Sequence, residues 1–254
     1  MTSRNRSQAL AAAALALLSL TACGSDSPAT AAAPADPPAS SPAAGAPPTS
    51  AAPSPTPRPA LVQADLERGL LALADLPTGY AVDRSATEDE AGEQAASSPL
   101  PGCAPLVALL NESETPGAVA TASVSLDGGA EFASFDETLD AFASAEQAAA
   151  AITREAAAVR GCETVTLALP GVGEVEFAVA EISFPELGDT RSAARLTATE
   201  GDLAGFELFA ASVAVGEVAV HTLAYDAFVE DVESTTEQAV DKVSKELVGG
   251  GSTA

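Results

Sequence analysis

The 254-residue chain has no tryptophan, one histidine, three cysteines and only 11 lysine and arginine residues against 36 acidic ones. A formal net charge of −25 repels phosphate groups, which argues against a nucleic acid-binding protein. With His221 as the single histidine, and without HExxH, CxxC, GxSxG or SxxK motifs, the sequence favours neither a zinc site nor a hydrolase. We therefore expect a binding domain that uses no metal and no cofactor.

Long apolar runs are also scarce, and the one at residues 9–20 is too short to span a bilayer, which takes roughly 20 apolar residues. Two arginines precede the run and small residues end it, so residues 1–22 are predicted to be a secretory signal peptide. The motif Leu20-Thr21-Ala22-Cys23 resembles the lipobox of bacterial lipoproteins. This resemblance implies lipidation of Cys23 and anchoring to the membrane; the alternative is a secreted protein with an incidental cysteine.

Residues 24–60 contain eleven of the 18 prolines, and alanine, serine and threonine make up most of the remainder. Such a composition cannot bury a core, so residues 23–60 are predicted to be the lipidated cysteine and a disordered tether. Fully extended as polyproline II, at ~3.1 Å per residue, the tether would reach about 115 Å. We expect it to hold the following domain away from the outer face of the cell membrane, in the cell wall space.

Residues 61–254 are predicted to form one extracellular domain with 34 acidic and eight basic residues, and so a net charge of −26. No later segment has 18 apolar residues in a row, so we do not expect this domain to cross the membrane. Once Cys23 is assigned to the lipid, Cys103 and Cys162 remain. An even pair of cysteines in an exported domain predicts a disulfide.

The hydrophobic pattern of this domain predicts an α+β fold. A capping box, Ser144-x-x-Gln147, begins a helix that ends near Gly161, and a second long helix is expected at about 230–248. Period-two alternation predicts strands at 118–126, 131–142, 164–169, 174–184, 191–200, 205–215 and 217–225. We expect an antiparallel sheet of about six to seven strands with the two long helices packed on one face.

Few side chains stand out as site candidates. Arg191 and Arg195, four apart on a predicted strand, would point to the same face and could clamp a carboxylate or phosphate; the alternative is pairing with neighbouring acids. His221 is expected to be a hydrogen-bonded strand residue that shares a face with Leu223 and Tyr225. The acidic segment 88–93 lacks the ligand spacing of a calcium loop and is expected to be solvated.

Four segments in order carry a resemblance to a known family: "LLALADLPTGY", the "CAPL" segment at Cys103, the run from "EFASFDETLDAF" to "RGC", and "PELGDTRSAARL". They resemble actinobacterial cell-surface lipoproteins that are similar to the extracellular sensor domains of mycobacterial-type Ser/Thr kinases. The likeness covers most of residues 61–248, although Tyr80 stands where we expect tryptophan in such proteins. It implies ligand binding in a groove beside the sheet, and no catalytic residue.

Together these observations predict a membrane-anchored cell-envelope lipoprotein with a sensor-like domain that binds an envelope ligand or a protein partner without catalysis. Three alternatives remain open at this point. A lipid carrier would need a large apolar cavity, a secreted hydrolase would depend on His221, and a passive wall-associated spacer would have no pocket.

Overall fold

The computed structural model describes residues 60–83, 95–129, 132–169, 171–225 and 227–249. The predicted signal peptide, Cys23, nearly all of the tether and the acidic segment 88–93 lie outside these residues. The described residues all belong to one compact unit, Thr56–Ala254. None of the helices in the described part of the chain has the length and apolar character needed to cross a membrane.

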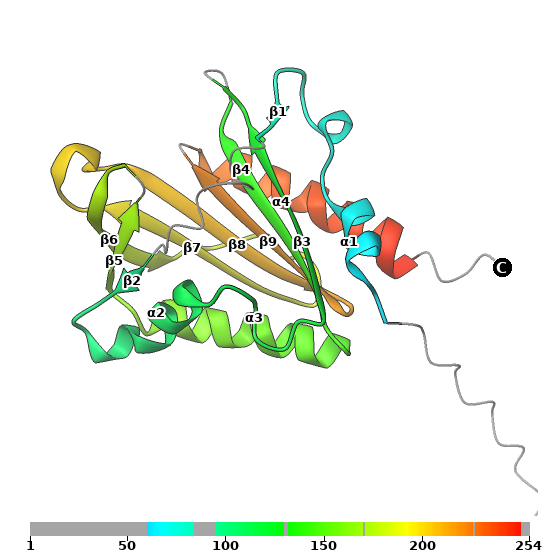
Figure 1. Cartoon of the computed structure of the whole chain (residues 1–254), viewed down its shortest axis with the longest axis horizontal. Coiled ribbons are helices and arrows are strands. Elements are labelled where there is room, and N and C mark those ends of the chain that lie inside the picture. The colour runs from blue at the N-terminus through cyan, green and yellow to red at the C-terminus, as the bar shows by residue number, and fades with distance from the viewer. Residues whose placement is uncertain (1–59, 84–94, 130–131, 170, 226, 250–254) are drawn as a thin grey trace, which may run out of the picture. The chain divides into compact units, whose positions relative to one another are not determined.

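Nine strands of the described residues form a single antiparallel sheet in the order β1-β3-β4-β9-β8-β7-β6-β5-β2 (Figure 1). The strands are β1 (Ala81–Val82), β2 (Ala96–Ser97), β3 (Ala120–Asp127), β4 (Ser134–Ala141), β5 (Thr164–Leu169), β6 (Gly173–Glu181), β7 (Thr190–Ala198), β8 (Glu207–Val215) and β9 (Val218–Tyr225). The α+β class and the antiparallel sheet are confirmed. The expected six to seven strands were too few, because β1 and β2 are too short to show any alternation.

The α-helices in the described residues are α1 (Gln63–Gly69), α2 (Ala104–Asn111), α3 (Ala145–Arg160) and α4 (Val229–Val243). A π-helical turn, Ser244–Val248, extends α4. Helix α3 begins at the predicted cap, where the backbone N–H of Gln147 donates to Ser144 Oγ over 3.3 Å. Lys242 near the end of α4 forms an ion pair with Asp75, at 2.6 Å between Nζ and Oδ2.

The two long helices cover opposite faces of the sheet, which corrects the expectation that both pack on one face (Figure 1). Ile152 and the alanines of α3 pack against Ala214 and Ala219, whereas the second half of α4 packs against Val213 and Val220. Neighbouring residues on a strand point to opposite faces, so these contacts place α3 and α4 on opposite sides. Helix α2 lies on the α3 side, and α1 on the α4 side (Figure 1).

Strand β8 shows why the hydrophobic pattern led us to expect both helices on one face of the sheet. Its residues are buried or half-buried at every position, on both faces of the strand. A strand that is buried on both faces needs other elements packed on both faces. Its sequence is a continuous apolar run, so it shows no alternation of apolar and polar residues.

A disulfide joins Cys103 and Cys162, with an S–S distance of 2.08 Å and 4.2 Å between the Cα atoms. This confirms the predicted pairing. The bond links the residue before α2 to the segment after α3, and the backbones meet there so closely that a Cβ at Gly102 would lie 2.6 Å from the Gly161 carbonyl oxygen. Helix α2 is thereby held against the end of α3.

A buried carboxyl, that of Glu137, lies on the face of the sheet that α1 and α4 cover. The side chain of Glu137 in β4 is 1 % exposed, and the Leu71 backbone N–H donates to its Oε2 over 2.6 Å. Oε1 has no hydrogen-bond partner among the described residues. Burial raises the pKa of Glu137 to about 7, against the lowering effect of the Leu71 N–H and of Lys242, while Asp75 raises it further.

Candidate ligand-binding groove

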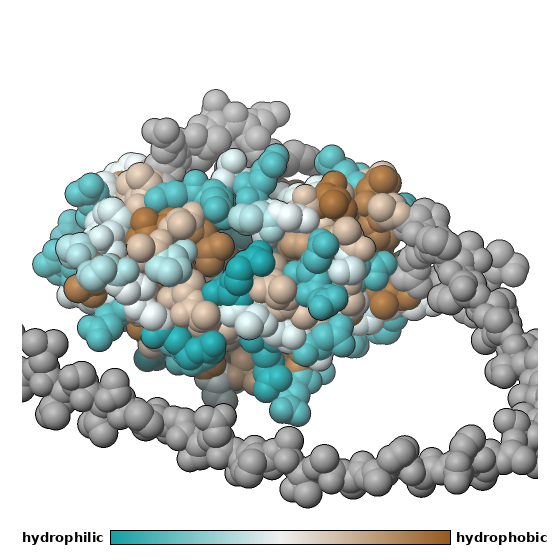
Figure 2. Space-filling model, turned by 90° about the horizontal axis from the view of Figure 1, so that it is seen from below, coloured by the Kyte–Doolittle hydropathy of each residue, from teal (hydrophilic) through white to brown (hydrophobic). Residues whose placement is uncertain are grey.

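A groove of about 360 Å³ lies on the α3 face of the sheet, between the strands on one side and α2, the residues after it and α3 on the other. Eleven of its 21 lining residues are apolar: Leu106, Leu109, Leu110, Pro116, Ala151, Val159, Val179, Ala194, Leu196, Ala210 and Leu223. The view from below, onto the side of α2 and α3, shows brown apolar residues set among teal polar ones (Figure 2).

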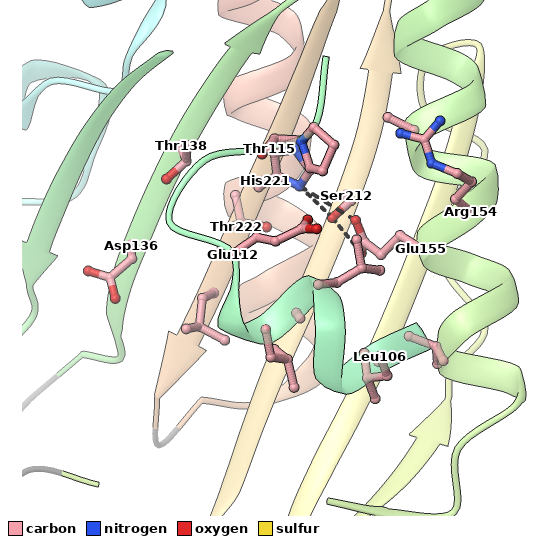
Figure 3. Close-up of a pocket in the computed structure, with 18 of the residues that line it drawn as sticks. Leu106, Glu112, Thr115, Asp136, Thr138, Arg154, Glu155, Ser212, His221 and Thr222 are labelled. Atoms are coloured by element: carbon pink, nitrogen blue, oxygen red, sulfur yellow. Dashed lines mark hydrogen bonds and ion pairs between the residues drawn. The ribbon is translucent and has the colours of Figure 1, made fainter. Parts of the chain in front are cut away.

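Polar residues of the groove come from five segments of the chain (Figure 3). They are Glu112, Glu114, Thr115, Asp136, Thr138, Arg154, Glu155, Ser212, His221 and Thr222. The register of the sheet brings three of them into one row, because Thr138 of β4 and Ser212 of β8 both lie opposite His221 of β9. Glu155 reaches the same row from α3, which crosses this face of the sheet.

The hydroxyl of Ser212 connects His221 to Glu155. Ser212 Oγ donates to Glu155 Oε1 over 2.7 Å and lies 2.8 Å from His221 Nδ1. A carboxylate only accepts, and the hydroxyl has a single hydrogen, so the imidazole must donate from Nδ1 to Ser212. We assign this tautomer from the hydrogen-bond network.

The other ring nitrogen of His221, Nε2, is not hydrogen-bonded within the described residues. This nitrogen is buried, and Asp140 Oδ2 is 3.5 Å away. Asp140 is 1 % exposed and accepts hydrogen bonds from the hydroxyls of Thr115 and Thr121. As expected, His221 shares a face with Leu223 and Tyr225, but only one of its two nitrogens is hydrogen-bonded.

This network has the residue types of a serine hydrolase without its geometry. In such enzymes the serine gives its proton to the histidine and is exposed to the substrate. Here the hydroxyl hydrogen goes to Glu155, and Ser212 is 3 % exposed. The part of the chain that the structure describes also holds no cluster of His, Cys, Asp and Glu able to bind a metal ion.

A second polar contact on this face joins Tyr225 of β9 to Asp136 of β4. Tyr225 donates its hydroxyl hydrogen to Asp136 Oδ2 over 2.5 Å. Burial raises the pKa of Tyr225, and the neighbouring Asp136 raises it further, so the phenol keeps its proton and remains the donor.

Comparison with known proteins assigns this architecture to a family. The model of the PknH-like extracellular domain matches residues 61–244. The chain belongs to this family. The match confirms the predicted similarity to the sensor domains of mycobacterial-type kinases and supports an extracellular location for the domain.

Two solved structures resemble the PknH-like domain. The crystal structure of the extracellular domain of PknH from Mycobacterium tuberculosis matches with a TM-score of 0.53 and 19% identity, over 74% of this chain and 99% of that chain. An uncharacterized protein from Mycobacterium smegmatis matches with a TM-score of 0.40 and 13% identity, over 72% of this chain and 97% of its own. The first of these likenesses supports the fold alone. No curated protein sequence matches the chain.

The two arginines predicted as an anion clamp lie outside the groove of the PknH-like domain. Ala194 and Leu196 of β7 line the groove, so Arg191 and Arg195 point to the opposite face. Arg191 pairs with a glutamate at 3.4 Å, and Arg195 with a second one at 3.5 Å. These pairs are partly exposed and are worth about 0–1 kcal/mol each, so the clamp stays a prediction.

Sequence reasoning singled out His221 but not its partners. Ser212 and Glu155 carry no local signal, because serine is common and the PknH-like domain has 34 acidic residues. The register of β8 and β9, together with the path of α3, brings them together.

Proposed function

We propose that this PknH-like domain is the ligand-binding, sensor-like part of a membrane-anchored cell-envelope lipoprotein, and that it holds a small molecule in the groove without catalysis. The observation that carries the proposal is the groove itself. Its volume of about 360 Å³ and its lining of apolar residues interspersed with polar groups that can orient a ligand are typical of small-molecule sites.

The disulfide supports a groove that exists before the ligand arrives. Cys103 and Cys162 hold α2 at the end of α3, and these helices form one wall. A wall that is already in place lowers the cost of ordering on binding.

The alternatives explain these features less well. A passive spacer needs no groove of this kind. A lipid carrier needs a large apolar cavity, whereas the groove measures about 360 Å³ and has ten polar residues in its lining. A hydrolase that depends on His221 as the base for a serine needs that serine to donate to the histidine, whereas the hydrogen of Ser212 is given to Glu155.

Anchoring is supported by the lipobox at Cys23 and by the proline-rich tether. A double acyl anchor gives stable membrane attachment, and the tether would leave the groove accessible above the membrane.

Native mass spectrometry of the chain purified from its own host tests the binding proposal. Ala210 is half-buried on the groove floor, so Ala210→Phe is expected to fill the groove. Ala178, half-buried on the opposite face of β6, provides the matched variant Ala178→Phe. A ligand mass retained by the wild type and by Ala178→Phe, and lost from Ala210→Phe, supports the groove. Identical spectra for all three proteins count against it.

A further inference from the structure

The charged residues of the groove are unbalanced. Four carboxylates line it, Glu112, Glu114, Asp136 and Glu155, whereas Arg154 is the one lysine or arginine among the lining residues. The net charge of the groove lining is thus negative, as is that of the whole domain, which disfavours the approach of anions.

Two of these carboxylates face the same end of the groove. Glu112, after α2, and Glu155, on α3, reach toward the region of Ser212 and His221, whereas the guanidinium of Arg154 is directed away from them (Figure 3). Two negative charges in a partly apolar space repel each other, and a cation bound between them would offset this repulsion.

No lysine or arginine of the described residues neutralises this end of the groove. The ion pairs that arginine and lysine form all use carboxylates outside the groove, such as Glu181 with Arg160 and Asp75 with Lys242. Within the groove, Glu155 accepts from Ser212 and lies 3.7 Å from His221 Nδ1. Asp136 and Glu155 thus have hydrogen-bond donors, and His221 lies within ion-pair distance of Glu155, but no lysine or arginine of the described residues pairs with a carboxylate of the groove.

Apart from these charged residues, His221 and the hydroxyl-bearing residues, the lining is apolar. Leu106 and Leu109 of α2 face Leu196 and Leu223 of the sheet across a space large enough for a hydrocarbon body. Burial of apolar surface there would supply affinity at about 25 cal/mol per Å² before the costs of association. One end of the groove is therefore suited to hydrocarbon, and the other to positive charge.

We infer that the groove selects cationic amphiphiles, small molecules that carry a protonated amine on an apolar body. The inference rests on the proposed function, because it names the class of ligand for the same groove. The amine would lie between Glu112 and Glu155, and the hydrocarbon against the leucines.

Three probes with the same alkyl chain isolate the contribution of the head group. Octylamine, 1-octanol and octanoate are titrated into the full chain by calorimetry at about pH 7, where an amine with an ordinary pKa of about 10.4 is protonated. We expect octylamine to bind about tenfold more tightly than 1-octanol, and octanoate to bind most weakly. The preference for the amine should shrink as salt is added, because salt screens charges.

Single substitutions locate the binding site of the amine. Glu155→Gln retains an acceptor for Ser212 and is expected to weaken octylamine three- to tenfold, at about the magnitude of one partly exposed ion pair, with 1-octanol unchanged. Glu112→Gln is expected to act in the same direction. Glu237→Gln, an exposed position on α4, is the matched control and should leave all three affinities unchanged.

The outcomes separate this inference from the proposed function. Equal binding of octylamine and 1-octanol would overturn the charge selection while leaving the groove as a binding site. Tightest binding of octanoate would reverse the sign of the selection and assign the head group to Arg154. If none of the probes binds, or if Ala210→Phe binds all three like the wild type, groove binding fails and the inference fails with it.

Discussion

Replacing Glu137 with glutamine is expected to remove a penalty on folding that grows with pH. The carboxyl is 1 % exposed between β3 and β9, and its raised pKa of about 7 reflects burial that the Leu71 N–H only partly offsets. The unfolded chain holds the same carboxyl at its ordinary pKa of 4.5. The two states therefore bind protons differently over the range between these values.

The sign follows from which state ionises first. Below pH 4.5 the carboxyl is protonated in both states and costs nothing. As pH rises from 4.5 to 7 the unfolded chain loses the proton first, so the free energy of unfolding falls. Above pH 7 the loss is complete and amounts to about 3 kcal/mol, from 1.36 kcal/mol for each of about 2.5 pKa units.

The experiment compares urea unfolding of the wild type and of Glu137→Gln, followed by circular dichroism at about pH 5 and about pH 8. Both values lie above the isoelectric point of about 4.1, where the protein keeps a net negative charge. The new amide group leaves a buried N–H donor unpaired, at a cost of about 1–3 kcal/mol that does not depend on pH. The decisive quantity is thus the change in the stability difference between the two pH values, expected to be about 2.5 kcal/mol in favour of the variant at the higher pH.

Glu237→Gln on the exposed side of α4 is the control, and its stability difference should stay constant within a few tenths of a kcal/mol. If Glu137→Gln also shows a constant difference from pH 5 to pH 8, the carboxyl titrates in the folded state as it does in the unfolded chain. That result would refute the reasoning from burial.

Three further predictions concern the cysteines and arginines. Cys103→Ser should lower the free energy of unfolding by about 4 kcal/mol, because the disulfide closes a loop with a sequence separation of 59, and thermal melting with and without reductant measures this. Cys23→Ala should abolish incorporation of radiolabelled palmitate, and persistent labelling would contradict the lipobox. Replacing Arg191 and Arg195 together with glutamine should abolish retention of inorganic phosphate while the melting temperature stays unchanged; equal loss of folding would mark them as structural ion-pair partners.

Local patterns in the sequence predicted individual elements well. The strand expected at 164–169 is β5 with the same bounds, and the capping box placed the start of α3 at the observed residue. These features depend on neighbours within a few residues, so the chain carries them without reference to the rest of the fold. The disulfide was also predictable, because an exported domain with two cysteines offers a single pairing.

Features that depend on contacts far apart in the sequence were not predictable in the same way. The two-residue strands at the sheet edges have no period to detect, and the apolar character of β8 on both faces concealed that α3 and α4 lie on opposite sides. The row of Thr138, His221 and Ser212 arises from the register of three strands, and Glu155 joins it from a helix. A single sequence contains no local pattern that predicts contacts between residues so far apart along the chain.

Strand β4 shows how the groove and the fold constrain each other. It lies within the sheet, where apolar residues are favoured, yet Asp136 and Asp140 point to the groove face and Glu137 to the other. A buried carboxylate is costly unless it is hydrogen-bonded, and each of these has its own donor: a tyrosine hydroxyl, two threonine hydroxyls and a backbone N–H. On the groove face Asp136 lines the space open to a ligand, where it adds negative charge that the fold has already accommodated through the Tyr225 hydroxyl. Natural proteins break local rules of this kind mainly at functional sites, so the composition of β4 supports the groove as the site of function.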